Sequence, residues 1–260
     1  MRAFGFALTL VVFGSVGCSP TSPDGDAPVP ASEAGVLGSG MRLRDVQNPA
    51  SKLAGSNVKV TTVVVTAVDN FDETHDGKSR GTIFLQDADK SGSLAGISLF
   101  SPSFQPTSLR LAPGDVVDLD GQYSEQSKIG ATVDFSPAFL PQIVKPVATF
   151  RFEVGEPKPI VINLADLTSF AAGGRQWIGQ LVTVLNVTAV TAPAGDSKNS
   201  GRVMANLSAD SKNGPQISNE LFDLPVNAFP ANTTFKSVTG VVTYFFNMKI
   251  AIRRQADLVQ

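Results

Sequence analysis

The residue types that carry most enzymatic chemistry are nearly missing from this chain of 260 residues. It contains one cysteine (Cys18), one histidine (His75), one tryptophan and two tyrosines. A zinc site needs three or four Cys, His or carboxylate ligands at fixed spacing, and Cys18 and His75 cannot supply them. A Ser-His-Asp triad would have to use His75, which lies in a polar turn-rich segment without a partner serine in a strand-to-helix elbow. We therefore expect no enzyme, no bound metal and no cofactor.

Basic residues are also in short supply. Lys and Arg number 21 against 23 Asp and Glu, which gives a net charge of −2. Proteins that grip nucleic acid without regard to sequence usually show a basic surplus, so this balance disfavours that function. After the N-terminal apolar stretch there is no second one near 20 residues, so the remainder of the chain is not expected to cross a membrane.

The first 17 residues have the features of a secretory signal. Arg2 is followed by the apolar stretch 3–13 and by small residues up to Cys18. The end of this segment resembles a bacterial lipobox, with a serine at Ser15 where the family usually has leucine. The resemblance implies that Cys18 carries a lipid anchor, and it identifies the membrane as a partner. An ordinary export signal with an incidental cysteine is the alternative.

The resemblance also implies a location in the outer membrane of a Gram-negative bacterium, either facing the periplasm or exposed at the surface. In enteric relatives an aspartate after the acylated cysteine tends to retain lipoproteins at the inner membrane, and here that residue is Ser19. Residues 18–40 are rich in Ser, Pro, Gly and Ala and have little to bury, which predicts a flexible tether.

The body of the chain contains an internal repeat. Val60–Val68 aligns with Val182–Val190, which lies 122 positions later. A repeat of this length indicates duplicated domains rather than a solenoid. We predict a signal peptide at 1–17, the acylated cysteine and tether at 18–40, a first domain at 41–148 and a second at 149–260, with the proline-rich segment 141–159 at the boundary.

Both copies read as all-β, with β-branched runs separated by turns. Five short strands per copy favour a small Greek-key barrel of the OB type, because an immunoglobulin-like sandwich would need about seven. The fold class is therefore two tandem five-stranded OB-like barrels. The expected strands are 58–68, 82–86, 94–100, 115–123 and 129–135 in the first copy, and 181–190, 202–207, 220–224, 234–244 and 249–252 in the second.

Several segments resemble a known group of bacterial proteins. They are Arg44–Pro49, Ile83–Asp87 and Leu111–Val117 in the first copy, with Trp177–Val184 and Ser237–Val242 in the second. Together they look like the tandem OB-fold lipoproteins common in myxobacteria and their relatives, whose modules are similar to OB domains attached to secreted nucleases. The resemblance covers nearly all of the chain after the tether. It implies fold and location, but the family has no residue set that defines a reaction.

An OB barrel most often binds its ligand on the exposed side of its second and third strands. If Ile83 and Leu85 face inward, Phe84 and Gln86 face outward, and Phe84 becomes a stacking platform unless the segment 101–113 covers it. The candidate ligand-binding residues are Phe84, Gln86, Lys78, Arg80 and Lys90 in the first copy, and Arg175 and Arg202, beside Trp177 and the Tyr244–Phe246 tip, in the second.

The loop Asp69–Gly77 carries four acidic residues, but it lacks the closing glutamate of a helix–loop–helix calcium site, so a structural loop is favoured over a calcium site.

Taken together, the sequence predicts a non-catalytic envelope lipoprotein that presents two OB-like modules to an extracytoplasmic protein, polysaccharide or nucleic acid. The alternatives are an accessory protein for extracellular nucleic-acid binding or processing, and a structural component of an outer-membrane assembly.

Overall fold

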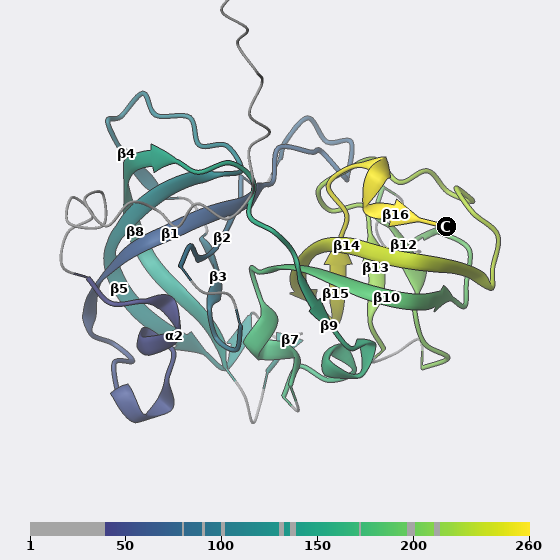
Figure 1. Cartoon of the computed structure of the whole chain (residues 1–260), viewed down its shortest axis with the longest axis horizontal. Helices are drawn as coiled ribbons and strands as arrows, with labels where there is room; N and C mark the ends of the chain where they lie inside the picture. The colour runs from purple at the N-terminus through teal and green to yellow at the C-terminus, as the bar shows by residue number, and fades with distance from the viewer. Residues whose placement is uncertain are drawn as a thin grey trace, which may run out of the picture. The chain divides into compact units, whose positions relative to one another are not determined.

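The fold is known here from a computed structural model, in which strands predominate among the regular elements and are joined by loops and a few short helices (Figure 1). Residues 37–260 form one compact unit. Cys18, Arg80 and Lys90 lie outside the described residues, as do the predicted signal peptide and all of the tether except Gly40. The structure describes residues 40–260 except 80, 90–91, 100–101, 130–132, 136–138, 172, 197–200 and 211–213.

The first sheet follows two short helical segments, α2 (Leu43–Val46) and η1 (Pro49–Ser51). Its strands are β1 (Asn57–Val68), β2 (Ile83–Asp87), β3 (Gly96–Leu99), β4 (Ser103–Gln105), β5 (Asp115–Gln126) and β8 (Leu140–Glu153). A separate hairpin consists of β6 (Lys128–Ile129) and β7 (Val133–Asp134).

Five of these strands close into a barrel in the order β3-β2-β1-β5-β8, because β8 pairs back to β3 in parallel at Ser98 and Gln142. The barrel interior is filled by alternate residues of the strands, including Val63, Val65 and Leu85. The prediction of an all-β first module built as a five-stranded barrel is confirmed, and its strand order is consistent with an OB-like fold.

The fifth strand of this barrel is not the one that the sequence predicted. The expected strand at 129–135 is replaced by the β6–β7 hairpin, and the barrel is closed by β8, which runs through the predicted boundary after residue 148. The prolines explain the error. Lys145 and Pro146 together oppose the single residue Gly121, so Pro146 lies in a β-bulge, where a strand tolerates a missing N–H donor.

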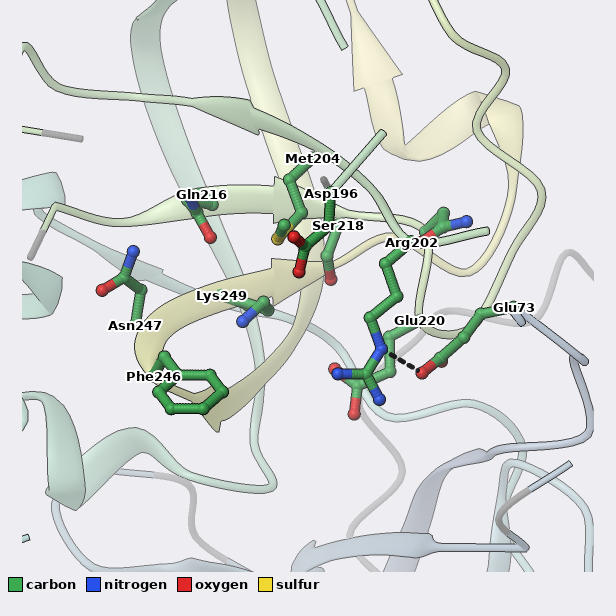
Figure 2. Close-up of a pocket in the computed structure, with 11 residues that line it drawn as sticks. Glu73, Asp196, Arg202, Met204, Gln216, Ser218, Glu220, Phe246, Asn247 and Lys249 are labelled. Carbon is green, nitrogen blue, oxygen red and sulfur yellow. Dashed lines mark hydrogen bonds and ion pairs between the residues drawn. The ribbon is translucent and has the colours of Figure 1, made fainter. Parts of the chain in front are cut away.

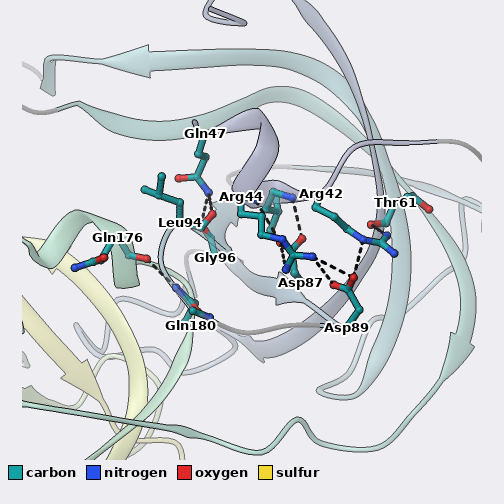
Figure 3. Close-up of polar contacts among 12 residues, drawn as sticks. Arg42, Arg44, Gln47, Thr61, Asp87, Asp89, Leu94, Gly96, Gln176 and Gln180 are labelled. Atoms are coloured by element: carbon teal, nitrogen blue, oxygen red, sulfur yellow. Dashed lines mark hydrogen bonds and ion pairs between the residues drawn. The ribbon is translucent and has the colours of Figure 1, made fainter. Parts of the chain in front are cut away.

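One end of the barrel is covered by α2, which is held by a buried carboxylate (Figure 3). Asp87 accepts the backbone amides of Leu43 at 2.8 Å and Arg44 at 3.3 Å. Gln47, which follows the helix, donates to the backbone oxygens of Leu94 and Gly96 at 2.7 and 2.8 Å. The polar residues Asp87 and Gln47 thus fix α2 against the barrel.

The second sheet is built from the second copy of the repeat. Three short helices accompany it: η2 (Leu164–Leu167), η3 (Gly174–Trp177) and η4 (Gln255–Asp257). Its strands are β9 (Ile160–Ile162), β10 (Leu181–Ala189), β11 (Ala194–Gly195), β12 (Val203–Asn206), β13 (Gln216–Ser218), β14 (Thr233–Phe245), β15 (Asn247–Ala251) and β16 (Leu258–Val259).

This second sheet is open, so the prediction of two closed tandem barrels is not confirmed. Its strands follow the order β11-β12-β13-β15-β14-β10-β9, and β13 pairs with β15 in parallel as β3 does with β8. Closure would require β12 to pair with β10. Instead, β11 pairs with this edge of β12 through Ala194 and Gly195. Next to the end of β10, the backbone amide of Val190 donates to the backbone oxygen of Asn206, the last residue of β12.

The outward face of β2 packs against the second sheet. Phe84 and Ala67 form a buried cluster with Leu181 and Val241 of the second copy. The backbone amide of Leu181 donates to the side-chain oxygen of Gln86 at 3.0 Å. The predicted alternation, with Ile83 inside the barrel and its neighbour Phe84 outside, is confirmed, but the outside is another part of the same chain rather than solvent.

Candidate functional site

The structure moves the candidate ligand surface away from the first barrel. Phe84 is 2% exposed and Gln86 is 3% exposed, so neither can stack on or contact a ligand. The expectation that Phe84 is a stacking platform is therefore wrong. The physical reason is that the second sheet, rather than the segment 101–113, covers the face of β2. Lys78 remains exposed on the preceding loop.

Arg175 is engaged in a local polar network. It donates from Nε to the backbone oxygen of Phe139 at 2.9 Å and lies 3.6 Å from a carboxylate oxygen of Glu125. Glu125 also accepts from the hydroxyl of Tyr123, and burial together with this bond raises the pKa of Tyr123. Arg175 thus links η3 to the first barrel. Trp177, at the end of the same helical segment, packs against the core of the second sheet.

The acidic loop at 69–77 is organised by its own backbone. The carboxylate of Asp72 accepts the amides of Asp76 and Gly77, at 3.2 and 2.7 Å, and these bonds lower its pKa. His75 is exposed at the turn. Within the described residues, no group of three or more His, Cys, Asp or Glu side chains is placed to hold a metal ion.

Two of the predicted residues line pockets: Arg175 lines one of about 340 Å³ beside Tyr123 and Glu125, and Arg202 lines a smaller one that gathers several charged side chains. The Arg202 pocket lies on the outer face of β12, β13 and β15, with a cavity volume of about 120 Å³ (Figure 2). These strands correspond to β2, β3 and β8 of the first barrel, whose face is partly covered. The lining residues are Glu73 from the first copy, and Asp196, Arg202, Met204, Gln216, Ser218, Asn219, Glu220, Phe246, Asn247 and Lys249 from the second.

Charged side chains form one wall and the floor of this pocket. Arg202 donates from Nε to a carboxylate oxygen of Glu73 at 2.9 Å, and both side chains are about nine-tenths buried. Glu220 accepts the hydroxyl of Thr243 at 2.6 Å, and burial raises its pKa. Lys249 is 5% exposed, and the same desolvation lowers its pKa to about 8. The floor therefore presents an amine that titrates close to neutral pH.

Asp69, at the end of β1, belongs to the same charged region. It is fully buried, and it has no hydrogen-bond partner close enough to compensate fully for that burial. Burial is the largest cause that raises its pKa to about 7, followed by repulsion from Glu220 and Glu73. At neutral pH this carboxyl is therefore divided between its protonated and ionised forms.

The remaining lining residues are neutral polar groups beside an aromatic ring. Asn219 is fully used, since it bonds the backbone of Val203 and Gly201. Ser218 differs, because it is 2% exposed and its hydroxyl has no hydrogen-bond partner. At the rim, Phe246 is 53% exposed at the tip of the β14–β15 hairpin. The site thus combines donors and acceptors with an exposed apolar surface, as ligand pockets commonly do.

Sequence reasoning found Arg202 and the Phe246 tip but missed Ser218, Glu220 and Lys249. The sequence does contain one signal for Lys249, because this charged residue lies between Met248 and Ile250 in an apolar strand, where a charge is unexpected. The fully buried environment of β15 could not be read from that pattern.

Comparison with known protein families, curated proteins and solved structures finds no match for this chain. Across the part of the chain that the structure describes, none of the helices has the length and apolar character of a membrane span. The geometry of the pocket is therefore the basis for a proposed function.

Proposed function

We propose that the protein is a non-catalytic lipoprotein of the bacterial envelope, anchored through Cys18, which binds an extracytoplasmic partner with the pocket of its second OB-like module. In this view the chain is a tandem of two OB-like modules with divided roles. The first module supports the second, and the second carries the binding surface. Residues 18–40 act as the tether between the anchor and this body.

The observation that carries the proposal is that equivalent faces of the two copies differ in burial. On the first sheet the outward side of β2 is buried under Leu181 and Val241. On the second sheet the outward side of β12 and β13 opens into the charged and polar pocket. OB folds commonly bind their ligands on this pair of strands. A duplicated fold that buries this face in one copy and keeps it open in the other leaves the face of the second module available to a partner.

The charge of the pocket separates this function from nucleic-acid binding. Glu73, Asp196 and Glu220 contribute three acidic groups to the pocket, and Arg202 and Lys249 contribute two basic groups. Arg202 is already bonded to Glu73. Nucleic-acid sites instead depend on an excess of Lys and Arg that neutralises phosphates. The partner is therefore an envelope component other than nucleic acid.

The proposal is tested by binding the full-length chain, purified in detergent, to envelopes isolated from the producing bacterium. The variants Phe246→Ala and Lys249→Met change the pocket, and Phe139→Ala is a matched control because Phe139 is an exposed phenylalanine, 41% accessible, that does not line it. We expect saturable binding that both pocket variants weaken and the control leaves unchanged. Binding that is absent, or equal in all variants, would contradict the proposal.

The anchor is tested separately. Replacement of Cys18 by serine should release the protein from the membrane fraction, since one or more acyl chains at this position supply the attachment. A Cys18→Ser chain that stays in the membrane fraction with unchanged detergent partitioning would refute the lipid anchor while leaving the pocket argument intact.

A further inference from the structure

We infer that the pocket on β12, β13 and β15 is a saccharide site, which takes a sugar residue that is neutral or carries an amine and bears no acidic group. This inference rests on the proposed function and specifies its ligand. It is carried by three features of the pocket: its interleaved donors and acceptors, an unsatisfied buried hydroxyl, and an exposed aromatic ring.

The polar groups of the pocket match the hydrogen bonding of a polyol. Each hydroxyl of a sugar both donates and accepts, so its site must offer both kinds of group side by side. The carboxylates of Asp196 and Glu220 can only accept when ionised, whereas Lys249 can only donate when charged. Figure 2 shows Lys249 between these carboxylates and the hairpin residue Asn247, whose amide can do both.

Ser218 indicates that a ligand group belongs here. Its hydroxyl is buried in the pocket wall without a hydrogen-bond partner. A desolvated hydroxyl without a partner destabilises a folded protein, so native structures rarely keep one without a reason. A ligand hydroxyl in the cavity would supply the missing partner at the cavity wall.

Phe246 supplies the apolar part of the site. A pyranose ring has an apolar C–H face as well as its hydroxyls, and such a face packs against an aromatic ring, which offers a large rigid contact area. Phe246 is more than half exposed at the pocket rim, in the hairpin that joins β14 and β15. An aromatic ring at the rim and polar groups at the floor fit one face and one edge of the same sugar.

The charge of the lining selects among saccharides. An acidic sugar, like a phosphodiester, would bring a negative charge toward Glu73, Asp196 and Glu220, and Arg202 is already bonded to the first of these. Repulsion between like charges in a poorly solvated pocket disfavours such a ligand. Neutral sugars avoid this repulsion, and an amino sugar would gain attraction from the carboxylates.

The test uses the full-length chain in detergent and, as probe, the polysaccharide extracted from the producer's envelopes with hot aqueous phenol and then digested with protease and nuclease. We expect saturable binding that is lost when the polysaccharide is oxidised with periodate, which cleaves the vicinal diols of sugars. Phe246→Ala should weaken this binding roughly two- to tenfold, from the loss of one aromatic contact, and Phe139→Ala should leave it unchanged.

Ser218→Ala separates a binding role from a structural one. Loss of a hydrogen bond to the sugar should weaken binding roughly two- to tenfold. The same variant should keep or raise the resistance of the free protein to urea, because it removes an unsatisfied buried hydroxyl. A variant that loses urea resistance, or that binds the polysaccharide as the parent does, would overturn the assignment of Ser218.

The outcomes distinguish the saccharide from other partners. If the chain binds whole envelopes through the pocket but not the polysaccharide, and protease treatment of the envelopes abolishes binding, the partner is a protein. The saccharide inference is then wrong and the proposed function stands. If pocket variants do not affect binding to whole envelopes, the saccharide inference and the proposed function are both wrong. Binding to the polysaccharide that survives periodate would also overturn the inference.

Discussion

Arg202 and Glu73 are 129 positions apart in the chain, and their side chains are joined by a 2.9 Å hydrogen bond between Nε and a carboxylate oxygen. Glu73 lies in the loop after β1 of the first barrel, and Arg202 directly precedes β12 of the second sheet. The side chain that completes the wall of the pocket thus comes from the other copy of the repeat. The site exists only when both halves of the chain are folded and in contact.

The first prediction concerns this ion pair. Glu73→Gln should lower the free energy of unfolding by about 3–5 kcal/mol, because it removes the negative charge from a buried, hydrogen-bonded ion pair. Urea denaturation measures the change. The matched control is Arg254→Ala, which removes an ion pair with Glu156 whose arginine is 54% exposed and should cost less than about 1 kcal/mol. Equal effects of the two variants would show that burial does not govern the Glu73–Arg202 pair.

The second prediction is a pH dependence of stability that depends on Asp69. Its pKa is raised to about 7 in the folded state, mainly by burial. The folded protein therefore binds more protons than the unfolded chain between about pH 4 and pH 7, so the contribution of this group to stability is fully present below pH 4 and is lost as the pH rises toward 7. The slope is at most about 1.4 kcal/mol per pH unit.

Asp69→Asn should remove this contribution from the unfolding free energy measured by urea titration at a series of pH values. Asp87, whose pKa is raised by burial to about 6, acts in the same direction and remains in both proteins, so the difference between parent and variant isolates Asp69. The difference curve should change between pH 4 and 7 and be flat above pH 8. A flat difference over the whole range would contradict the raised pKa.

The third prediction concerns Phe84, which packs between the two sheets. Phe84→Ala should cost about 3–5 kcal/mol in the free energy of unfolding, because it leaves a cavity against Leu181 and Val241. Binding to envelopes should be unchanged under conditions in which the variant is folded. Phe139→Ala, which removes a ring of the same size from an exposed position, is the control and should be nearly neutral. A loss of binding at unchanged stability would restore Phe84 as a ligand residue.

The fourth prediction tests the close approach of the two sheets. A Cβ atom at Gly96 would lie 2.3 Å from the backbone oxygen of Ile178 and 2.9 Å from the backbone nitrogen of Gln180. Gly96→Ala should therefore destabilise the protein by about 3 kcal/mol or more, since the backbone itself must move. Gly173→Ala is the control, because its Cβ would be 3.4 Å from its nearest neighbour, the backbone oxygen of Asp166. Urea denaturation compares the two, and equal stability would refute the tight contact.

Cooperative unfolding should follow from the same contact. The sequence predicts two domains, and in the structure both copies of the repeat belong to one compact unit with a shared buried cluster around Phe84. We expect tryptophan fluorescence, which reports on Trp177 in the second half, and far-ultraviolet circular dichroism, which reports on both halves, to give coincident transitions. Two separated transitions would show that the halves unfold independently.

Local chemistry along the chain was enough to predict the repeat and most of the strands, although not those expected at 129–135 and 220–224. β-branched runs such as Val60–Val68 and Val182–Val190 favour extended backbone wherever they occur, and turn residues separate them. Strand alternation also placed Ile83 inside the barrel and Phe84 outside. These properties depend on neighbouring residues, so they can be read without knowledge of the fold.

Tertiary structure decided which outward residues are buried, which strand closes each sheet, and where the pocket lies. From the sequence, Pro146 is expected to end a strand, but in the structure it lies in a β-bulge opposite Gly121. The second sheet stays open because β11 pairs with the edge of β12. Phe84 reads as a platform for a ligand until the second sheet covers it, and Glu73 meets Arg202 only after both copies have folded. Each of these outcomes depends on contacts between residues far apart in the chain, which a local pattern of side chains does not encode.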